Sequence, residues 1–234
     1  MPLLEDEPPI APLIAVVGSD GSGKSTLAAD ILEHVRESRA AEMGYLGLGS
    51  GEQGRAIGRW PLIGAPLQRF FEGIADTLRD PHATIPGMPA ARYAMRRSRK
   101  RRARFDALLE RRRAGVTIVT DRYPQLEVAG LHDGPILAAK AVSEGVSALQ
   151  HRERALYAGM AIWLPTLVIR LNVDVDTVMA RKPDHVRALI ERKVATVPLL
   201  KFNGAPIVDL DATAPYDEEL ALALAAVDRA LADA

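Results

Sequence analysis

A glycine-rich loop near the N-terminus carries the strongest chemical signal in the sequence. It fits the pattern G-x-x-x-x-G-K-[S/T] and consists of Gly18, Ser19, Asp20, Gly21, Ser22, Gly23, Lys24, Ser25 and Thr26. Glycines at this spacing let successive backbone N–H groups turn toward one anion, and a helix N-terminus behind them adds its positive dipole end. We therefore expect the loop to bind the phosphates of a nucleotide. Lys24 would bridge the β- and γ-phosphates, and Ser25 would ligate Mg²⁺.

An acidic and a basic residue follow a second apolar run. The run Val116–Thr120 leads directly into Asp121, Arg122 and Tyr123. Because the carboxyl ends of parallel strands share one edge of a sheet, we expect Asp121 to face the glycine-rich loop. Its carboxylate can hold Mg²⁺ or accept a proton from an attacking group, and Arg122 can bind a phosphate through two parallel hydrogen bonds. An ordinary Asp–Arg pair at a strand end is the alternative, which the neighbouring loop disfavours.

A strongly basic helix is predicted between Arg92 and Arg113. This segment contains eleven Lys or Arg residues and two acidic residues, which suits a solvated helix face or a nucleic-acid or membrane surface. Helical spacing, however, places Arg97, Arg101 and Arg104 on one stripe beside the core-facing Phe105. Because a buried unpaired cation is costly, we expect these arginines to bind a phosphate of the substrate. The remaining basic residues are expected to face solvent: Arg99, Lys100, Arg102 and Arg111–Arg113.

Five short apolar runs must position these residues. They are Leu13–Val17, Met43–Leu48, Val116–Thr120, Leu167–Leu171 and Ile207–Leu210. Such nearly continuous apolar runs are typical of strands that are buried on both faces. Helical patterns separate them, and the expected helices include Lys24–Ala40, Pro66–Leu78, Val186–Thr196 and Tyr216–Ala232. We therefore predict an α/β fold in which a five-stranded parallel sheet is covered by helices on both faces.

Composition narrows the classes of function. The 234 residues include 30 basic and 30 acidic side chains and no cysteine. Balanced charge argues against a dedicated nucleic-acid-binding protein, and the missing cysteine excludes disulfides and Cys-ligated metals. Residues 1–12 have acids where a secretory signal needs basic residues, and no apolar stretch is long enough to cross a bilayer. We expect a cytoplasmic protein without nucleic-acid or membrane partners, with a flexible lead-in at residues 1–12 and a single domain at residues 13–234.

Several of these features together resemble the thymidylate kinase family. The glycine-rich loop contains Asp20 between its glycines, and Arg101 precedes the D-R-Y triplet at Asp121 by twenty residues. The segments Leu167–Val173 and Ile207–Thr213 are similar to the fourth and last strands of that family. The resemblance covers most of the chain, and it implies a three-layer P-loop NTPase fold with strand order 2-3-1-4-5 that forms one kinase domain.

The resemblance also implies roles on the donor side. A short lid at about residues 181–187 would close over ATP, and Arg181 would stabilise charge on the transferred phosphoryl group. Ala212 and Thr213 would lie in the loop beside the adenine. ATP and Mg²⁺ are the implied cofactors, with Ser25 and Asp121 around the metal ion. An exposed basic turn is the alternative interpretation of the lid.

On the acceptor side, the resemblance places Asp20 near the acceptor. It implies that Arg122, Tyr123 and the arginines of the basic helix bind the acceptor. An acceptor-side insert would span about residues 49–89. The Arg-Glu-Pro-Gly loop that thymidylate kinases carry after the second strand is absent, so dTMP is only weakly implied. Asp133 is a further candidate for acceptor contact, with an Asp-Gly turn as the alternative.

The predicted function is therefore ATP-dependent phosphoryl transfer to a small acceptor, such as a nucleotide or a nucleoside. The alternatives that stay open are a nucleotide kinase that uses polyphosphate, a P-loop ATPase and a nucleotide-binding regulatory protein. A homodimer is implied by analogy alone. The sequence does not identify the acceptor.

Overall fold

Five parallel strands form one sheet in the computed structural model, which describes residues 10–47, 73–74 and 76–234. The strands are β1 (Leu13–Gly18), β2 (Ala41–Met43), β3 (Thr117–Thr120), β4 (Leu167–Asn172) and β5 (Ile207–Asp211). Their order across the sheet is β2-β3-β1-β4-β5, and each neighbouring pair is parallel. The predicted fold class and strand order are confirmed.

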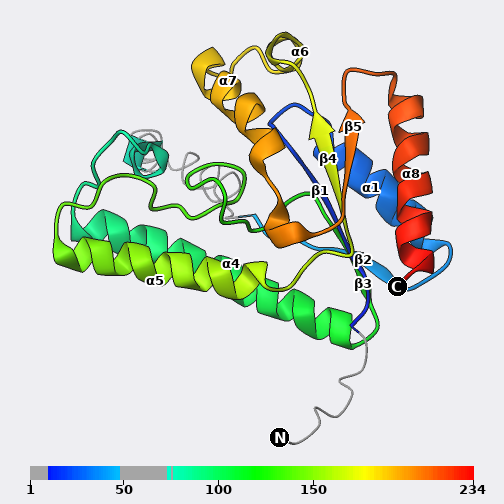
Figure 1. Cartoon of the computed structure of the whole chain (residues 1–234), viewed down its shortest axis with the longest axis horizontal. Coiled ribbons are helices and arrows are strands. Elements are labelled where there is room, and N and C mark those ends of the chain that lie inside the picture. The colour runs from blue at the N-terminus through cyan, green and yellow to red at the C-terminus, as the bar shows by residue number, and fades with distance from the viewer. Residues whose placement is uncertain (1–9, 48–72, 75) are drawn as a thin grey trace, which may run out of the picture.

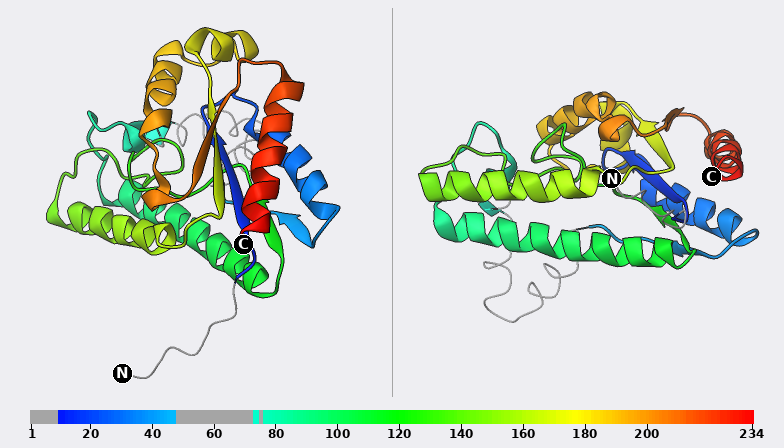
Figure 2. Two further views of the ribbon diagram at one scale, coloured as in Figure 1. Left: turned by 45° about the vertical axis from the view of Figure 1, so that its right-hand side comes forward. Right: turned by 60° about the horizontal axis from the view of Figure 1, so that its bottom comes forward.

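Helices cover both faces of this sheet (Figure 1). One face packs against α1 (Lys24–Arg36) and α8 (Tyr216–Ala232), and the other packs against α4 (Met88–Arg113) and α5 (Glu144–Ala161). Figure 2 shows α4 and α5 side by side and extending beyond the sheet. Beyond β4 the chain forms α6 (Val175–Arg181), α7 (Arg187–Thr196) and the 3₁₀ turns Val197–Leu199 and Phe202–Gly204. No helix within the described ranges is both long and apolar enough to cross a membrane.

The side chains of β1 alternate between two hydrophobic cores. Ile14 and Val16 belong to the core beneath α1 and α8, whereas Leu13, Ala15 and Val17 belong to the core beneath α4 and α5. All five side chains are at most 5% exposed. Because both faces of the strand are buried, it has no polar face, and this explains its uninterrupted apolar run.

The predicted position of the second strand is wrong. β2 spans Ala41–Met43 rather than Met43–Leu48. It lies at the edge of the sheet with β3 as its neighbour, and the side chain of its middle residue, Glu42, pairs with Arg111 at the surface. An edge strand can carry a charged residue, so a search for apolar runs misses it. The Gly44 amide still donates a hydrogen bond to β3, after which the chain leaves the sheet.

The predicted helix Tyr216–Ala232 has the bounds of α8, whereas the other predicted boundaries that differ from the structure do so by one to four residues. The helix after the glycine-rich loop ends at Arg36 rather than Ala40, because the amides of Ser38 and Arg39 both donate to the Val35 carbonyl and turn the chain toward β2. The predicted helix Pro66–Leu78 lies largely outside the described residues, although residues 76–79 are helical. Most of the predicted insert at residues 49–89 and most of the predicted lead-in also lie outside them.

The prediction that all of Arg111–Arg113 face solvent is wrong for Arg112. Its side chain is 3% exposed, and its Nε donates to the Ala11 carbonyl oxygen at 2.6 Å. The chain that enters β1 crosses the C-terminal end of α4 at this point. Helical spacing within α4 contains no information about that crossing.

Glu153 on α5 fixes the end of the loop that joins β3 to α5. Its carboxylate is fully buried and accepts hydrogen bonds from the backbone amides of Ile136 at 3.1 Å and Leu137 at 2.8 Å, and from the Ser98 hydroxyl on α4. Burial raises the pKa of Glu153, and the three donors act against that rise. The carboxylate therefore joins both long helices to the loop that carries Asp133.

We expect Glu153→Gln to destabilise the fold measurably. The amide nitrogen of glutamine cannot accept a hydrogen bond, so a buried donor loses its acceptor, and the free energy of unfolding should fall by about 1–3 kcal/mol. Urea denaturation measures this change. The matched control is Glu110→Gln, which removes an exposed pair with Arg113 and should cost at most about 0.5 kcal/mol. Equal losses in the two variants would contradict the assignment.

Candidate active site

The glycine-rich loop forms a cradle at the carboxyl end of β1. Gly21 and Gly23 have φ angles of 75° and 94°, which favour glycine. A Cβ on Gly18 would lie 2.8 Å from the Leu171 carbonyl oxygen, so the backbone packs too closely there for a side chain. The N-terminus of α1 has neither a side-chain cap nor an acidic residue in its first turn. Its amides are therefore available to an anion.

Two polar side chains of this loop lack the full set of hydrogen-bond partners that they could bind. The hydroxyl of Ser22 is buried and has no hydrogen-bond partner in the described part of the chain. The Lys24 Nζ donates to the Ser19 carbonyl oxygen at 2.5 Å. Burial lowers the pKa of Lys24, and the nearby Asp20 acts in the opposite direction. An inward-facing ammonium and an unpaired hydroxyl beside open amides fit the phosphates of a nucleotide.

The two predicted metal ligands lie together. The Ser25 hydroxyl, in the first turn of α1, donates to Asp121 Oδ2 at 2.7 Å. β1 and β3 are adjacent in the sheet, and this adjacency brings the residue after one strand next to the helix that follows the other. A hydroxyl and a carboxylate oxygen are ligands that Mg²⁺ accepts alongside water and phosphate oxygens. The pair therefore fits the metal ion that the sequence predicts.

Arg101 on α4 is held by the protein itself. Its side chain is 1% exposed, and its guanidinium donates to the carbonyl oxygens of Leu46 at 2.9 Å and Asp133 at 2.8 Å and to the Tyr157 hydroxyl at 2.9 Å. The fourth contact joins Nη2 to the Asp133 carboxylate at 2.5 Å. The predicted inward orientation is confirmed, but the partner of this cation is Asp133 rather than a substrate phosphate.

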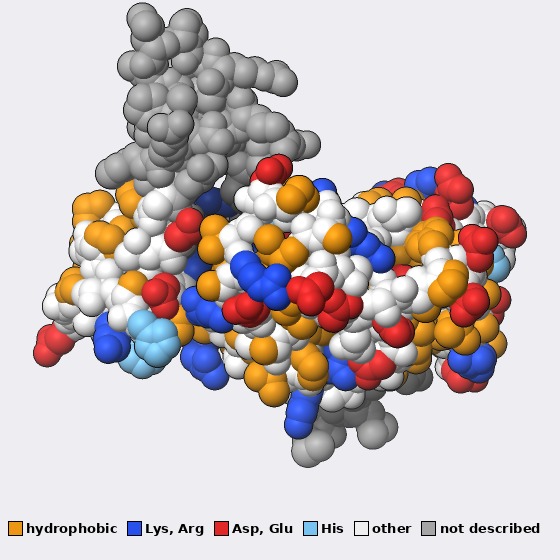
Figure 3. All heavy atoms as spheres, turned by 90° about the horizontal axis from the view of Figure 1, so that it is seen from above, with side chains coloured by type: hydrophobic (Ala, Val, Ile, Leu, Met, Phe, Trp, Pro, Cys, Tyr) orange, Lys and Arg blue, Asp and Glu red, His pale blue; other side chains and the backbone are white. Residues whose placement is uncertain are grey.

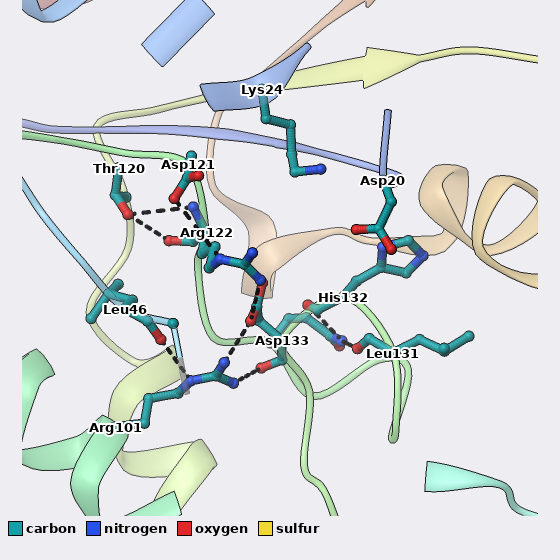
Figure 4. A network of polar contacts seen from close by, with 12 residues as sticks. Asp20, Lys24, Leu46, Arg101, Thr120, Asp121, Arg122, Leu131, His132 and Asp133 are labelled. Carbon is teal, nitrogen blue, oxygen red and sulfur yellow. Dashed lines mark hydrogen bonds and ion pairs between the residues drawn. The ribbon is translucent and has the colours of Figure 1, made fainter. Parts of the chain in front are cut away.

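Arg122 lies between two carboxylates at the end of β3 (Figure 4). Its guanidinium is 3.6 Å from Asp133 Oδ1 and 4.0 Å from Asp121 Oδ1, so both ion pairs are long. Asp133 is the main cause of the raised pKa of Arg122. The side chain is 41% exposed, and Lys24 and Asp20 point toward the same region. Arg122 is therefore able to bind an additional anion.

The loop that carries Asp133 is fixed by its own residues. His132 and Asp133 have φ angles of 45° and 63°, in the left-handed region. The buried side chain of Gln125 donates to the carbonyl oxygens of Val128 and Leu131 at 2.8 and 2.9 Å. These contacts hold the turn in a conformation that directs the Asp133 carboxylate toward both arginines.

Helix α7 contacts both the glycine-rich loop and the loop with Asp133. Lys193 forms an ion pair with Asp20, and the Lys193 carbonyl oxygen and the Thr196 hydroxyl each lie 2.9 Å from His132 Nε2. Burial opposes the ionisation of Asp20, but Lys193 holds the pKa of Asp20 below its ordinary value. Burial lowers the pKa of His132, which favours the neutral ring.

These elements line a cavity of about 880 Å³. Figure 3 views the molecule from above and shows basic and acidic side chains close to one another on this face. The cavity has the same mixed character, and Gly18 of the glycine-rich loop is among its lining residues. The charged residues that line it are Asp20, Lys24, Asp76, Arg79, Asp80, Arg101, Arg122, Asp133, Arg192 and Lys193.

Three residues predicted to bind the acceptor lie outside this lining. Tyr123 is a core residue, since it is 2% exposed, its ring contacts Phe105, and its hydroxyl donates to the Trp163 carbonyl oxygen. The prediction for Tyr123 is therefore wrong. Arg104 donates to the Gly47 carbonyl oxygen, and Arg97 donates to the Tyr93 hydroxyl at 3.0 Å.

On the other side of the glycine-rich loop, Arg181 joins two predicted donor-side segments. Its guanidinium donates to the Gly21 carbonyl oxygen at 3.2 Å and to the Ala212 carbonyl oxygen at 2.9 Å. Thr213 instead turns back to the Asp211 carboxylate. Arg187, placed in the lid by resemblance, pairs with Asp176 and Glu191 at the surface.

Lys193 and Arg79 are cavity residues that the sequence predictions missed. Lys193 had a detectable signal, because it lies three residues after the fully buried Ile190 and therefore on the inner side of its helix. Arg79 had no such signal, since it comes directly after the predicted helix Pro66–Leu78 and no motif there marks it as a functional residue. The fold alone brings it to the cavity.

Comparison with known proteins gives close relatives. The chain is 42% identical over 221 residues to the uncharacterized ATP-binding protein YghS of Escherichia coli K12, covering 94% of this chain and 93% of YghS. It is 38% identical over 217 residues to the uncharacterized ATP-binding protein YghR of the same strain, covering 92% and 86%. A deoxyadenosine kinase from M. mycoides with bound dATP has the same fold, with a TM-score of 0.52 at 16% identity over 92% of this chain and 98% of that one. A scan against models of protein families finds no match.

We expect Asp133→Asn to destabilise the protein by about 3 kcal/mol, because it leaves the buried Arg101 without a counter-charge. Asparagine tolerates the left-handed backbone at this position, so the loss is attributable to charge. Chemical denaturation measures it. Asp106→Asn is the matched control, since it removes the more exposed ion pair with Arg102 and should cost at most about 1 kcal/mol. If the two variants were equally stable, Asp133 would not compensate Arg101.

Proposed function

This chain belongs to the family of the Escherichia coli proteins YghS and YghR, and from that premise we propose that it is an ATP-dependent kinase. It would transfer the γ-phosphoryl group of ATP to a small molecule bound in the cavity. Both relatives are named as ATP-binding proteins, which supports ATP as the donor. The fold shared with the deoxyadenosine kinase is compatible with this reaction.

One observation carries the proposal, namely that residues of the phosphate cradle also line a cavity. Gly18, Asp20 and Lys24 belong to the glycine-rich loop and also line the cavity of about 880 Å³. That volume suits a small organic molecule. A donor held in the loop would therefore present its terminal phosphate to a molecule in the cavity, as in-line transfer requires.

Different residues of the chain would bind the donor, orient the acceptor and hold the metal ion. The amides of the loop and Lys24 would bind the donor phosphates, while Arg181, already bound to Gly21, would hold the loop against the Ala212 segment. Asp121 or Asp20 would orient the acceptor's nucleophilic group and accept its proton. A magnesium ion held by Ser25 and Asp121 would supply charge neutralisation during transfer.

The proposed acceptor class remains that of nucleotides and nucleosides or similar small molecules. Arg122 supports it, because this arginine lies beside Lys24 and keeps donors for another anion. The resemblance to thymidylate kinases remains a proposal for this chain, since the loop that would grip dTMP is missing from the sequence.

We expect Lys24→Ala to lower acceptor-dependent ADP release by at least about 100-fold, because it removes the cation at the transferred phosphate. The assay supplies ATP, Mg²⁺ and a panel of nucleosides, nucleoside monophosphates and sugar derivatives. Lys100→Ala, which removes an exposed lysine on α4, is the matched control and should leave the rate unchanged.

Normal turnover by the Lys24→Ala variant would refute the proposal. ATP hydrolysis at one rate with and without every acceptor would instead indicate an ATPase. A parallel arm replaces ATP with polyphosphate, and faster product formation in that arm would indicate a polyphosphate-using kinase.

A further inference from the structure

Arg79 lines the cavity with a guanidinium group that is partly buried and that has no counter-charge beside it among the described residues. It belongs to the helical residues 76–79, and its side chain is partly buried where it lines the cavity. Within the described residues, Arg79 has no hydrogen bond or ion pair through its guanidinium. Its nearest opposite charges, Asp76 and Asp133, act on it only over longer distances. A partly buried guanidinium in this situation lacks the counter-charge that such groups normally have.

The other cations of the cavity all have partners. Lys193 pairs with Asp20, Arg101 pairs with Asp133, and Lys24 donates to a carbonyl oxygen of its own loop. Arg122 shares Asp133 and Asp121. Arg192 lies 4.0 Å from Asp80, next to Arg79 in the sequence. The lining contains six cationic and four acidic side chains, and among the cations Arg79 is the least compensated.

Arg79 also lies away from the reacting end of the cavity. Its charged neighbours are Arg97, Arg101, Asp76 and Asp133, whereas those of Lys24 are Asp20, Arg122, Asp133 and Asp121. Asp133 is the neighbour that these two sets have in common. Figure 1 shows the helical residues 76–79 above α4, at a distance from β1.

Neighbouring positive charges add to the cost of leaving Arg79 unpaired. Burial lowers the pKa of Arg79, and Arg97 and Arg101 lower it further. Arg101 cannot move away, because four hydrogen bonds fix it. An anion beside Arg79 would offset this repulsion and could accept hydrogen bonds from the planar donors of the guanidinium.

We propose that Arg79 binds an anionic group of the acceptor, a phosphate or a carboxylate, at the end of the cavity remote from Lys24. This inference rests on the proposed kinase function and narrows its substrate class. The acceptor carries its nucleophilic group at the Lys24 end and a separate negative charge at the other end. Neutral nucleosides and neutral sugars lack that second group and are excluded as preferred acceptors.

The direct test is calorimetric titration of inorganic phosphate into the full chain. The titration is done in the presence of Mg²⁺ and a saturating non-hydrolysable ATP analogue, which fills the phosphate cradle, and repeated without them. Arg79→Ala should weaken phosphate binding by about tenfold or more. Arg79→Lys keeps the charge without the planar donors and should give an intermediate affinity. Arg99→Ala removes an exposed arginine of α4 and is the matched control for net charge.

A second measurement separates ligand binding from a structural role. Because Arg79 has no partner to lose among the described residues, Arg79→Ala should melt at the same temperature as the wild-type chain or higher. A clearly lower melting temperature would assign Arg79 to the fold and overturn the proposal. Phosphate binding that is absent in the wild-type chain, or equal in wild type and Arg79→Ala, would overturn it as well.

Matched acceptor pairs identify the source of the anion. The pairs are a nucleoside monophosphate with its nucleoside, a sugar phosphate with its sugar, and a sugar acid with its sugar. Higher kcat/KM for a charged member, lost in Arg79→Ala through KM, supports the proposal, whereas equal use of both members contradicts it. Failure of the chain to bind the ATP analogue, with Arg79-dependent phosphate binding intact, would refute the kinase function and not the anion site.

Discussion

The cavity depends on the contacts of Asp133, whose carboxylate pairs with two arginines. Arg101 comes from the long helix α4 and Arg122 from the end of β3, and one carboxylate compensates both. A buried guanidinium without this partner would cost several kcal/mol, so the loop with Asp133 must close over Arg101 for the fold to be stable. This requirement gives the cavity its fixed wall, and Gln125 and Glu153 hold the two ends of that wall.

The two halves of the site are built in different ways. The phosphate cradle consists of consecutive residues, and its geometry follows from glycine backbone angles and the start of α1. The acceptor side is assembled from residues 76–80, α4, the loop around Asp133 and α7. A local loop suits the donor, because a triphosphate needs many backbone donors in one place. A cavity with several walls suits an acceptor, because specificity needs groups that approach from different directions.

Helix α7 links these halves. Lys193 binds Asp20 in the cradle, while the carbonyl of the same residue and the side chain of Thr196 contact His132 next to Asp133. A displacement of α7 would therefore break contacts on the donor side and on the acceptor side together. The surface ion pairs of Arg187 show that the first turn of this helix is fixed against α6 and its own next turn rather than against the cradle.

The sequence by itself determined the parts of the molecule that depend on neighbouring residues. The glycine-rich loop, the buried strands and the meeting of Ser25 with Asp121 follow from residue spacing and from the rule that parallel strands end at one edge. Only the tertiary structure decided which partner each charge received. Tyr123 became a core residue, Arg101 paired with Asp133, and Arg79 came to line the cavity with no partner in the part of the chain that the structure describes. The tertiary structure also put β2 at an edge, where Glu42 interrupts the apolar pattern. These outcomes depend on segments far apart in the chain, and no local pattern records which of them will meet.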